Sequence, residues 1–576
     1  MRKMNTKKKN NVLEIVCFCL FCILTAFLSC FHEPWFDEFQ AWGISKDTVY
    51  NILFVIPHYE GHPPLWHLIL KIFSSLNFHP EIGIRIPNLL FMYGAVWLII
   101  FKSPFTPPLK LLLPFTYFLF YQYSIVNRPY SIFCFAIFLS AVFYKERNEH
   151  PFRFIMALIL LCFSSLYGMV IAAGIVFAWF LEIIIKEKPD FKGFIKCARF
   201  KAMLLIFFVC SALVIELLPS EDVFALSSDK VFACGAKILY SYLILPADAL
   251  FYNFMDEVMI FYIFHINLSE FIMDFSKNIQ VLFPFLLGCF LGLIVNLLLL
   301  IAFKKMNKLL LFAIPYLLFL SLTAGYIGTH HIGLLTVFII AMFWYVLSDL
   351  KEEIKYTKFV YIFVIFCIII QCYWSKCSFD NEMKYDYSAS RKLVSYIKNC
   401  NMDKYMIMSE WLPSYSVYRH NKTKKLYRGK SKLTYDGYVN FQKNYTRITI
   451  ENFYIQREAV TVNQYFGRNI FYNFNIDNPE KSYSVFKKMT PLEGEKLKEK
   501  LRALGVPEII VGKAEIEKVF DMNELSKYKY IVFAEINFVT TWKDKRMYDA
   551  LKIYVRDDIY NKLKNENKQV KYNEIK

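Results

Sequence analysis

The sequence lacks the cysteine framework of a secreted protein held together by disulfides. Most of its 14 cysteines lie inside apolar runs, where they are typical of small core residues. Only Cys377 and Cys400 fall in the more polar C-terminal part, and no spacing pattern supports a disulfide between them. The chain also lacks an internal repeat, which excludes a repeat architecture.

No motif that reads a nucleic-acid groove is present, although the net charge is +18. From Cys377 onward the chain has 37 Lys and Arg against 25 Asp and Glu, so this part carries +12 of that charge. The same part is rich in tyrosine and in strand-like runs. Attraction to anionic lipid headgroups or anionic glycans explains the charge more simply. We therefore expect membrane lipids as partners, and no nucleic acid.

No small-residue cleavage site follows the first apolar run. The preceding segment, MRKMNTKKKNN, resembles the charged region of a signal peptide, but the run at 12–31 is about as long as a membrane span. The sequence therefore predicts an uncleaved first membrane helix with a cytoplasmic N-terminus.

What the sequence does contain is apolar and aromatic residues, at 56% and 18%. Apolar runs of about 18 or more residues recur, which is typical of a polytopic membrane protein. We predict an α-helical domain over residues 1–376 with about eleven transmembrane helices, a first outer loop at 32–83 and an outer segment at 219–278. Among the expected spans are 84–102, 109–126, 130–144, 280–303, 332–348 and 357–374. Eleven spans place every lysine-rich short loop in the cytoplasm of a plasma-membrane protein and every polar motif outside.

The pattern changes from residue 377 onward. The runs YMIMS (405–409), EIIVG (508–512) and YIVFAEINFV (530–539) predict strands, and 387–399 and 491–504 predict helices. Residues 377–576 are therefore predicted to form an extracytoplasmic mixed α/β domain with a polar, basic C-terminal tail.

Asp37 and Glu38 stand side by side in the first outer loop. The stretch 35–46 predicts an amphipathic helix at the membrane interface, with its acids toward water. Its aromatic residues, expected to face lipid, are Trp35, Phe36, Phe39 and Trp42. A carboxylate at this boundary is solvent-accessible and partly desolvated, which suits the base needed for glycosyl transfer to a hydroxyl. The acids could instead only solvate the polar face of the helix.

A second polar group follows in HYEGHPP, residues 58–64. Glu60 and His62 could orient a substrate, or could join Asp37 in a site for a divalent metal ion. The alternative is a turn whose polar residues face water. The residues alone leave the metal unknown.

Basic residues at the outer ends of later spans could bind a lipid phosphate. Arg85 begins the span at 84–102, and Arg128 and Tyr130 lie in the turn NRPYS. Each guanidinium could grip a phosphate in a bidentate manner or could reach out to lipid headgroups. His330 and His331, at the outer edge between two spans, could donate to a phosphate or could be incidental.

Four passages together resemble the GT-C glycosyltransferases. They are WFDEFQAWGISKD, EGHPPLWHLILKIF, IRIPNLLFMYGAVWL with NRPYSIFCFAIFLSAVF, and GTHHIGLLTVFIIAMFW. In order and topology, residues 10–375 are similar to the branch that holds the lipid A aminoarabinose transferase and the protein O-mannosyltransferases.

The resemblance implies an enzyme that moves a hexosyl or pentosyl group from a polyprenyl-phosphate donor to an extracytoplasmic acceptor of the cell envelope, with inversion. It implies that Asp37, followed by Glu38, serves at the reaction centre as base or acceptor-positioning acid, and that Glu60 helps to arrange donor or acceptor. Arg128 and the pair His330–His331 match positions that are often basic, so phosphate contacts are expected there. His62 stands at the position where the aminoarabinose branch has a lysine, so the sequence differs from that branch here. By analogy, the C-terminal domain would govern the acceptor.

Two other classes of function compete with a transferase. A transporter or flippase of lipid-linked glycans needs charges near the middle of the membrane and often has paired halves. Here most charges lie at the ends of the expected spans, and no halved symmetry is visible. A non-catalytic envelope scaffold would leave the outer-loop acids dispensable.

Overall fold

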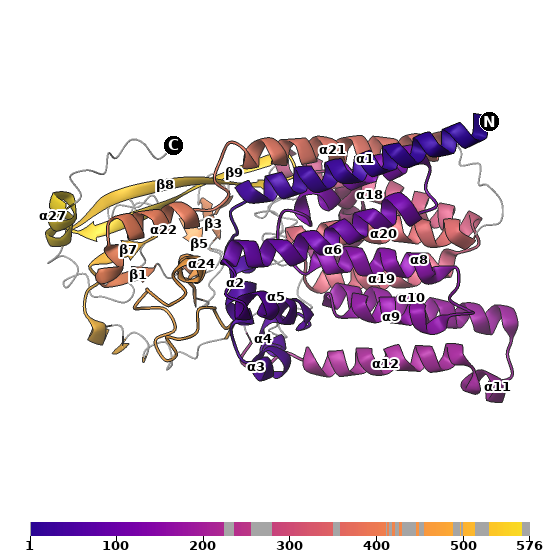
Figure 1. Cartoon of the computed structure of the whole chain (residues 1–576), viewed down its shortest axis with the longest axis horizontal. Coiled ribbons are helices and arrows are strands. Elements are labelled where there is room, and N and C mark those ends of the chain that lie inside the picture. The colour runs from indigo at the N-terminus through magenta and orange to yellow at the C-terminus, as the bar shows by residue number, and fades with distance from the viewer. Residues whose placement is uncertain are drawn as a thin grey trace.

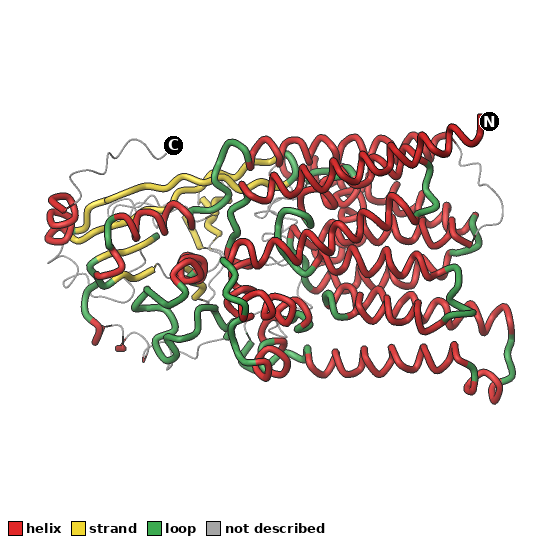
Figure 2. Tube along the Cα trace, viewed as in Figure 1, coloured by secondary structure: helices red, strands yellow, loops and turns green. Residues whose placement is uncertain are grey.

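In the computed structural model, a bundle of long helices meets a smaller part with strands and short helices at one end (Figures 1 and 2). The described residues are 2–223, 235–254, 279–349, 358–409, 412–413, 417–420, 426–428, 445–447, 454–487, 496, 499–500, 502–512 and 529–566. We call the end of the bundle that meets the C-terminal part the domain-facing end, and the other the opposite end.

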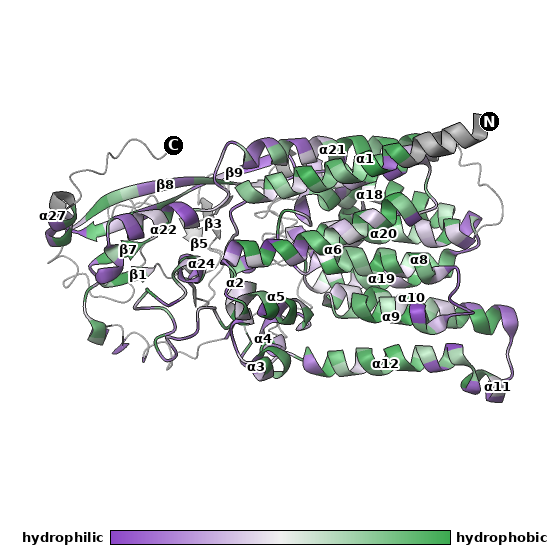
Figure 3. Ribbon diagram, in the orientation of Figure 1, coloured by the Kyte–Doolittle hydropathy of each residue, from purple (hydrophilic) through white to green (hydrophobic). Residues whose placement is uncertain are grey.

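Seven described helices are long and apolar enough to cross a membrane. They are α1 (Arg2–Phe31), α6 (Pro80–Lys102), α10 (Leu166–Glu187), α12 (Ala198–Glu216), α18 (Ile279–Lys305), α20 (Thr329–Asp349) and α21 (Lys358–Glu382). Hydrophobic residues cover most of their length in Figure 3. These seven helices agree with the prediction of a helical membrane protein, by length and composition.

Three shorter apolar helices of the described residues also belong to the bundle: α8 (Tyr130–Tyr144), α9 (Pro151–Cys162) and α19 (Leu309–Gly325). The expected continuous span at 109–126 is wrong. That segment comprises α7 (Pro107–Leu112), a 3-10 turn (Leu113–Phe115) and a π-helical turn, η2 (Phe118–Gln122). Pro114 lacks the backbone N–H that an α-helix needs at this position, which accounts for the break. The count of eleven spans stays a prediction.

Four short helices cover the domain-facing end. They are α2 (Phe36–Ser45), α3 (Val49–Phe54), α4 (Pro57–Glu60) and α5 (Leu65–Ser75). The expected orientation of α2 is wrong, because Phe36, Phe39 and Trp42 are buried in a protein core instead of facing lipid. The rings of Phe39 and Tyr465 lie 5.1 Å apart, so α2 packs on α24 (Arg457–Phe466) of the C-terminal part.

The C-terminal part holds a four-stranded sheet in the order β1-β7-β9-β8. Strand β1 (Ile407–Ser409) is parallel to β7 (Ile509–Val511), and β9 (Lys545–Arg556) runs antiparallel to both β7 and β8 (Tyr530–Trp542). Helices α22 (Ser390–Asn399) and α27 (Asp557–Glu566) share a hydrophobic core with the sheet. Short strands are also described: β2 (Leu412–Pro413), β3 (Val417–His420), β4 (Leu426–Arg428), β5 (Tyr445–Arg447) and β6 (Tyr454–Ile455). The three predicted strands and the helix in 387–399 are present.

Some expected features lie wholly or partly outside the described residues. Most of the helix predicted at 491–504 and the tail beyond residue 566 belong to these, as do residues 224–234 and 255–278 of the predicted outer segment. Cys377 and Cys400 are described, and both thiols are free.

The β8–β9 hairpin inserts its tip into the membrane bundle. The Trp542 and Tyr117 rings lie 5.6 Å apart. The Lys543 ammonium, fully buried, contacts the Asp248 carboxylate of α15 (Leu245–Leu250) at 3.0 Å and the Tyr252 carbonyl at 2.8 Å. The two parts of the chain therefore share a buried contact, and the domain-facing end is covered by protein.

Candidate active site

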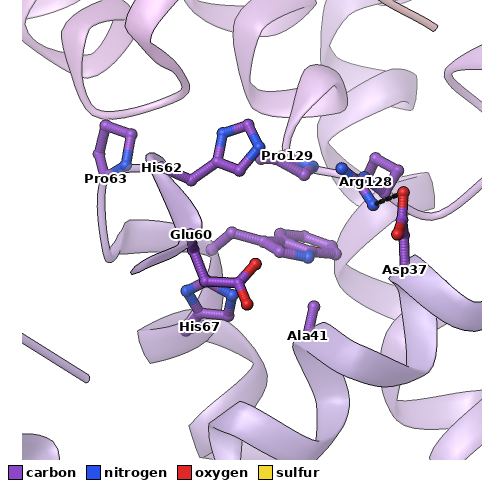
Figure 4. Close-up of a pocket in the computed structure, with 9 residues that line it drawn as sticks. Asp37, Ala41, Glu60, His62, Pro63, His67, Arg128 and Pro129 are labelled. Atoms are coloured by element: carbon purple, nitrogen blue, oxygen red, sulfur yellow. Dashed lines mark ion pairs between the residues drawn. The ribbon is translucent and has the colours of Figure 1, made fainter. Parts of the chain in front are cut away.

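A small cavity lies at the domain-facing end, between α2, α4, α5 and the turn before α8 (Figure 4). Its lining residues are Asp37, Ala41, Glu60, His62, Pro63, Trp66, His67, Arg128 and Pro129. Its volume is about 20 Å³, which accommodates about one water molecule. Four residues predicted from the sequence, Asp37, Glu60, His62 and Arg128, are thus brought together.

The starts and ends of the short helices position the side chains that line the cavity. Asp37 lies in the first turn of α2, whose start is capped because the Trp35 N–H donates to Glu38 Oε2 at 3.0 Å. Helix α4 ends at Glu60 because Gly61 adopts a left-handed conformation, with φ of 65°. Pro64 then precedes α5, which positions Trp66 and His67 against the cavity.

Arg128 and Asp37 form an ion pair, with Nη1 2.7 Å from Oδ2 (Figure 4). The guanidinium also lies over the Tyr130 ring, 5.8 Å from its centroid. Burial alone would lower the pKa of Arg128. The nearby carboxylates, first Asp37 and then Glu60, raise the pKa by more than burial lowers it, so the side chain stays charged. The cavity therefore holds one fixed positive charge between two carboxyl groups.

Glu60 is held by Gln40, whose Nε2 donates to Oε1 at 2.9 Å. Burial raises the pKa of Glu60 to about 7. The same Gln40 side chain exchanges two hydrogen bonds with the backbone of Ser484, so the C-terminal part contacts this acid through one residue. A carboxyl group with a pKa near neutrality can donate as well as accept a hydrogen bond, which suits the positioning of a substrate hydroxyl group.

Several buried nitrogens around the cavity have no hydrogen-bond partner within the described part of the chain. They are His62 Nδ1, Trp66 Nε1, His67 Nδ1 and Arg128 Nε. Burial lowers the pKa of His62 to about 3 and that of His67 to about 4, so both rings are neutral at pH 7. Trp66 Nε1 and Arg128 Nε can only donate, and Nδ1 of a neutral imidazole donates or accepts according to the tautomer, so this set fits a ligand with several oxygen atoms and hydroxyl groups.

Glu38 does not line the cavity. It is fully buried, and its Oε1 accepts from both the N–H and the Nδ2 of Asn127, each at 2.7 Å. The expectation that this acid faces water is therefore wrong. Because Asn127 precedes Arg128, Glu38 holds the turn that presents the arginine.

The two histidines of α20 contact the ring of Tyr130, which follows the cavity residues Arg128 and Pro129 in the chain. Its ring is 5.5 Å from that of His330 and 5.6 Å from that of His331. His331 Nδ1 accepts from the Gly328 N–H at 2.8 Å, which fixes the ring. Arg128, Tyr130 and both histidines thus form one group.

Arg85 lies apart from the cavity. Its Nη2 donates to Glu81 at 2.5 Å and to the His32 carbonyl at 2.9 Å. Arg391 of α22 binds the same carboxylate through two nitrogens, at 2.7 and 2.6 Å. Arg85 therefore belongs to the contact between the bundle and the C-terminal part.

The residues of the cavity do not fit the divalent metal site considered from the sequence. No three His, Cys, Asp or Glu side chains are grouped to hold a metal ion anywhere in the described ranges. Asp37 is instead paired with Arg128, and Glu60 with Gln40. We derive no step through a metal ion.

Sequence reasoning missed Trp66, His67, Gln40 and Ser484. The first two have a local signal, because they follow His62 by only four and five residues. The contact between Gln40 and Ser484 joins residues far apart in the sequence, and no local signal could have found it. No family model, curated protein or solved structure matches the chain.

Proposed function

We propose that the protein is an integral membrane glycosyltransferase that moves a sugar from a polyprenyl-phosphate donor to an extracytoplasmic acceptor. The observation that carries the proposal is the charged Arg128 between Asp37 and Glu60, in a cavity with unpartnered buried donors at one end of a membrane bundle. An arginine suits the phosphate of the donor, and the neutral donors suit its oxygens and the sugar hydroxyls.

Donor binding would separate the ion pair between Arg128 and Asp37. The cavity is too small for a sugar while the pair is closed, so the donor phosphate has to take over the guanidinium. Asp37 is then released beside the reaction centre, where a free carboxylate can accept a proton. In this account the donor itself prepares the base.

The reaction would be a single displacement. The acceptor hydroxyl gives its proton to Asp37, and its oxygen forms a bond to the anomeric carbon. The bond between that carbon and the phosphate oxygen breaks, and polyprenyl phosphate leaves with the electron pair, stabilised by Arg128. One displacement inverts the anomeric configuration. Glu60 would position a hydroxyl group, and the group of Tyr130, His330 and His331 would contact the phosphate from the other side.

The distribution of lysines supports an outer location for the site. The last turns of α6, α10 and α18 carry Lys102, Lys186, Lys304 and Lys305. The N-terminus and the end of α6 lie at the opposite end in Figure 1. By the positive-inside rule the opposite end would be cytoplasmic and the domain-facing end outside. We extend the proposal to a GT-C arrangement with eleven spans, the plasma membrane as location, and a C-terminal domain that governs the acceptor beside Glu60.

A flippase fits the bundle less well. A larger cavity, of about 210 Å³, lies among α18, α20 and α21, and its lining is almost wholly apolar. The ion pairs of Arg147 with Glu182 and Asp349 lie at the ends of their helices. A path for a glycan needs polar groups within the membrane.

The test is to incubate the purified full chain in detergent with a panel of polyprenyl-phosphate sugars and acceptor fragments of envelope glycans. A transferase releases polyprenyl phosphate from at least one donor in an acceptor-dependent manner. Absence of release with every donor, while the protein stays folded, would contradict the proposal.

A further inference from the structure

His32 lies just after α1, fully buried between two carboxylates from distant parts of the chain. Its Nε2 is 3.1 Å from Glu38 Oε2, and its Nδ1 is 2.9 Å from Glu382 Oε1 at the end of α21. The Tyr387 ring lies 4.8 Å from the imidazole. Neither the resemblance nor the cavity accounts for this arrangement.

With both carboxylates ionised, the arrangement is fully hydrogen-bonded when both ring nitrogens carry a proton. A neutral imidazole has one donor and one acceptor nitrogen, so one of the two carboxylates would face a lone pair. Burial lowers the pKa of His32, but Glu38 and Glu382 raise it to about 10. An imidazolium compensates two buried carboxylates that would otherwise repel each other.

The surrounding contacts hold the imidazolium in place. The His32 carbonyl accepts from Arg85 at 2.9 Å and from Arg391 at 2.8 Å, so its backbone is fixed from two sides. Tyr121 donates to the same Glu382 oxygen at 2.6 Å. The orientation of the ring is therefore set by the bundle and by the C-terminal part together.

From His32 the contacts lead directly to the arginine of the cavity. Glu38 binds His32 with one oxygen, and with the other it accepts the N–H and the side-chain amide of Asn127. Arg128 follows in the chain and carries the ion pair with Asp37. Only one hydrogen-bonded carboxylate separates the imidazolium from this turn.

We propose that His32 is a positioning residue of the transferase: as an imidazolium bound to Glu38 and Glu382, it fixes the carboxylate that holds the Asn127–Arg128 turn, and so orients Arg128 toward the donor phosphate. The proposal rests on the proposed function, in that it assigns the positioning of the phosphate-binding arginine. Glu38 acts in the same way, as a positioning residue and not as a base.

The first test is spectroscopic and needs no variant. In ¹⁵N-histidine-labelled full-length protein at pH 8.5, an ordinary histidine with a pKa near 6.5 is about 99% neutral. We expect an imidazolium signal, with both ring nitrogens protonated, from one of the ten histidines. If all ten are neutral at this pH, the proposal is overturned.

The second test uses His32→Gln, which keeps a polar side chain and removes the charge. We expect faster hydrogen exchange in the peptide that contains Asn127, because the N–H loses a fixed acceptor. We also expect the KM for the polyprenyl-phosphate donor to rise by roughly tenfold or more, since a displaced contact can cost up to about 100-fold. A merely structural defect would lower the apparent kcat through loss of folded protein and leave the KM unchanged.

Two further variants make the result specific. His79→Gln removes an exposed histidine at the start of α6 and should leave exchange and KM unchanged. The double variant His32→Gln/Glu382→Gln removes one of the two carboxylates that His32→Gln leaves uncompensated, and should restore part of the donor affinity. Exchange and KM like those of the wild type in His32→Gln would overturn the proposal. If the wild type is inactive with every donor but the exchange still changes, the transferase function fails, while the positioning of the turn is supported.

Discussion

Arg128 Nη1 lies 2.7 Å from Asp37 Oδ2, and this ion pair lines the cavity at the domain-facing end of the bundle. The pair joins the first turn of α2 to the turn before α8. In the proposed reaction it is exchanged for a pair between Arg128 and the donor phosphate.

Replacing Arg128 by lysine should impair transfer without unfolding the protein. Lysine keeps the charge but loses the planar guanidinium that binds a phosphate through two nitrogens. We expect kcat/KM for the donor to fall on the order of 10²–10³-fold, as for loss of one oxyanion donor. Steady-state kinetics of polyprenyl phosphate release measures this. The matched control is Arg199→Lys, which alters a bidentate ion pair with Glu187 far from the cavity. This variant should keep full activity.

Glu60 should make the stability of the protein depend on pH. Its pKa is about 7 in the folded state and about 4.5 when unfolded, so between these values only the folded protein holds the proton. Stability should therefore fall as pH rises from about 4.5 to 7, by at most about 3 kcal/mol from this group. Glu60→Gln should flatten that slope of the unfolding temperature in detergent. The surface variant Glu535→Gln should keep it, and an unchanged slope in Glu60→Gln would refute the assignment.

Replacing Lys543 by methionine should destabilise the contact between the hairpin and the bundle. The change leaves the Asp248 carboxylate buried without its cation, which costs about 3–5 kcal/mol. Thermal unfolding in detergent should show a clear decrease in midpoint. Lys552→Met, in a half-exposed pair on the same hairpin, should have little effect. Adding Asp248→Asn to Lys543→Met should recover part of the loss. Equal midpoints for Lys543→Met and the wild type would contradict this role.

The helices that could be predicted from the sequence are those whose signal is local. α8 begins at Tyr130 and ends at Tyr144, as expected, because its apolar run is bounded by a proline turn and by basic residues. The apolar residues of β8 predict a strand, whereas five of the twelve residues of β9 are charged and give no such signal. The π-helical turn at Phe118–Gln122 could not be predicted, because tertiary packing decides it.

In the candidate site, too, some residues have a local signal in the sequence and others depend on tertiary contacts. Asp37, Glu60 and Arg128 could be predicted because each is polar beside an apolar run. The burial of Glu38 depends on His32 and Asn127, and that of α2 on the C-terminal part. Arg85 has the same local pattern as Arg128 but pairs with Glu81, since Arg391 converges on that acid from another domain. Tertiary contacts, some of them between residues hundreds of positions apart such as Glu81 and Arg391, decide these roles, and a local pattern does not contain them.

The most direct measurement compares Asp37→Asn with the wild type for the donor that the wild type uses. Asparagine keeps the size of the side chain and cannot take the proton of the acceptor hydroxyl, so release of polyprenyl phosphate should fall by about 10²–10⁴-fold. Because the change also leaves Arg128 without its ion pair, the unfolding temperature should fall below that of Asp380→Asn, a control at an exposed pair with Lys376 that should remain fully active, so activity is compared per amount of folded protein. Full transferase activity in a folded Asp37→Asn protein would contradict the central claim.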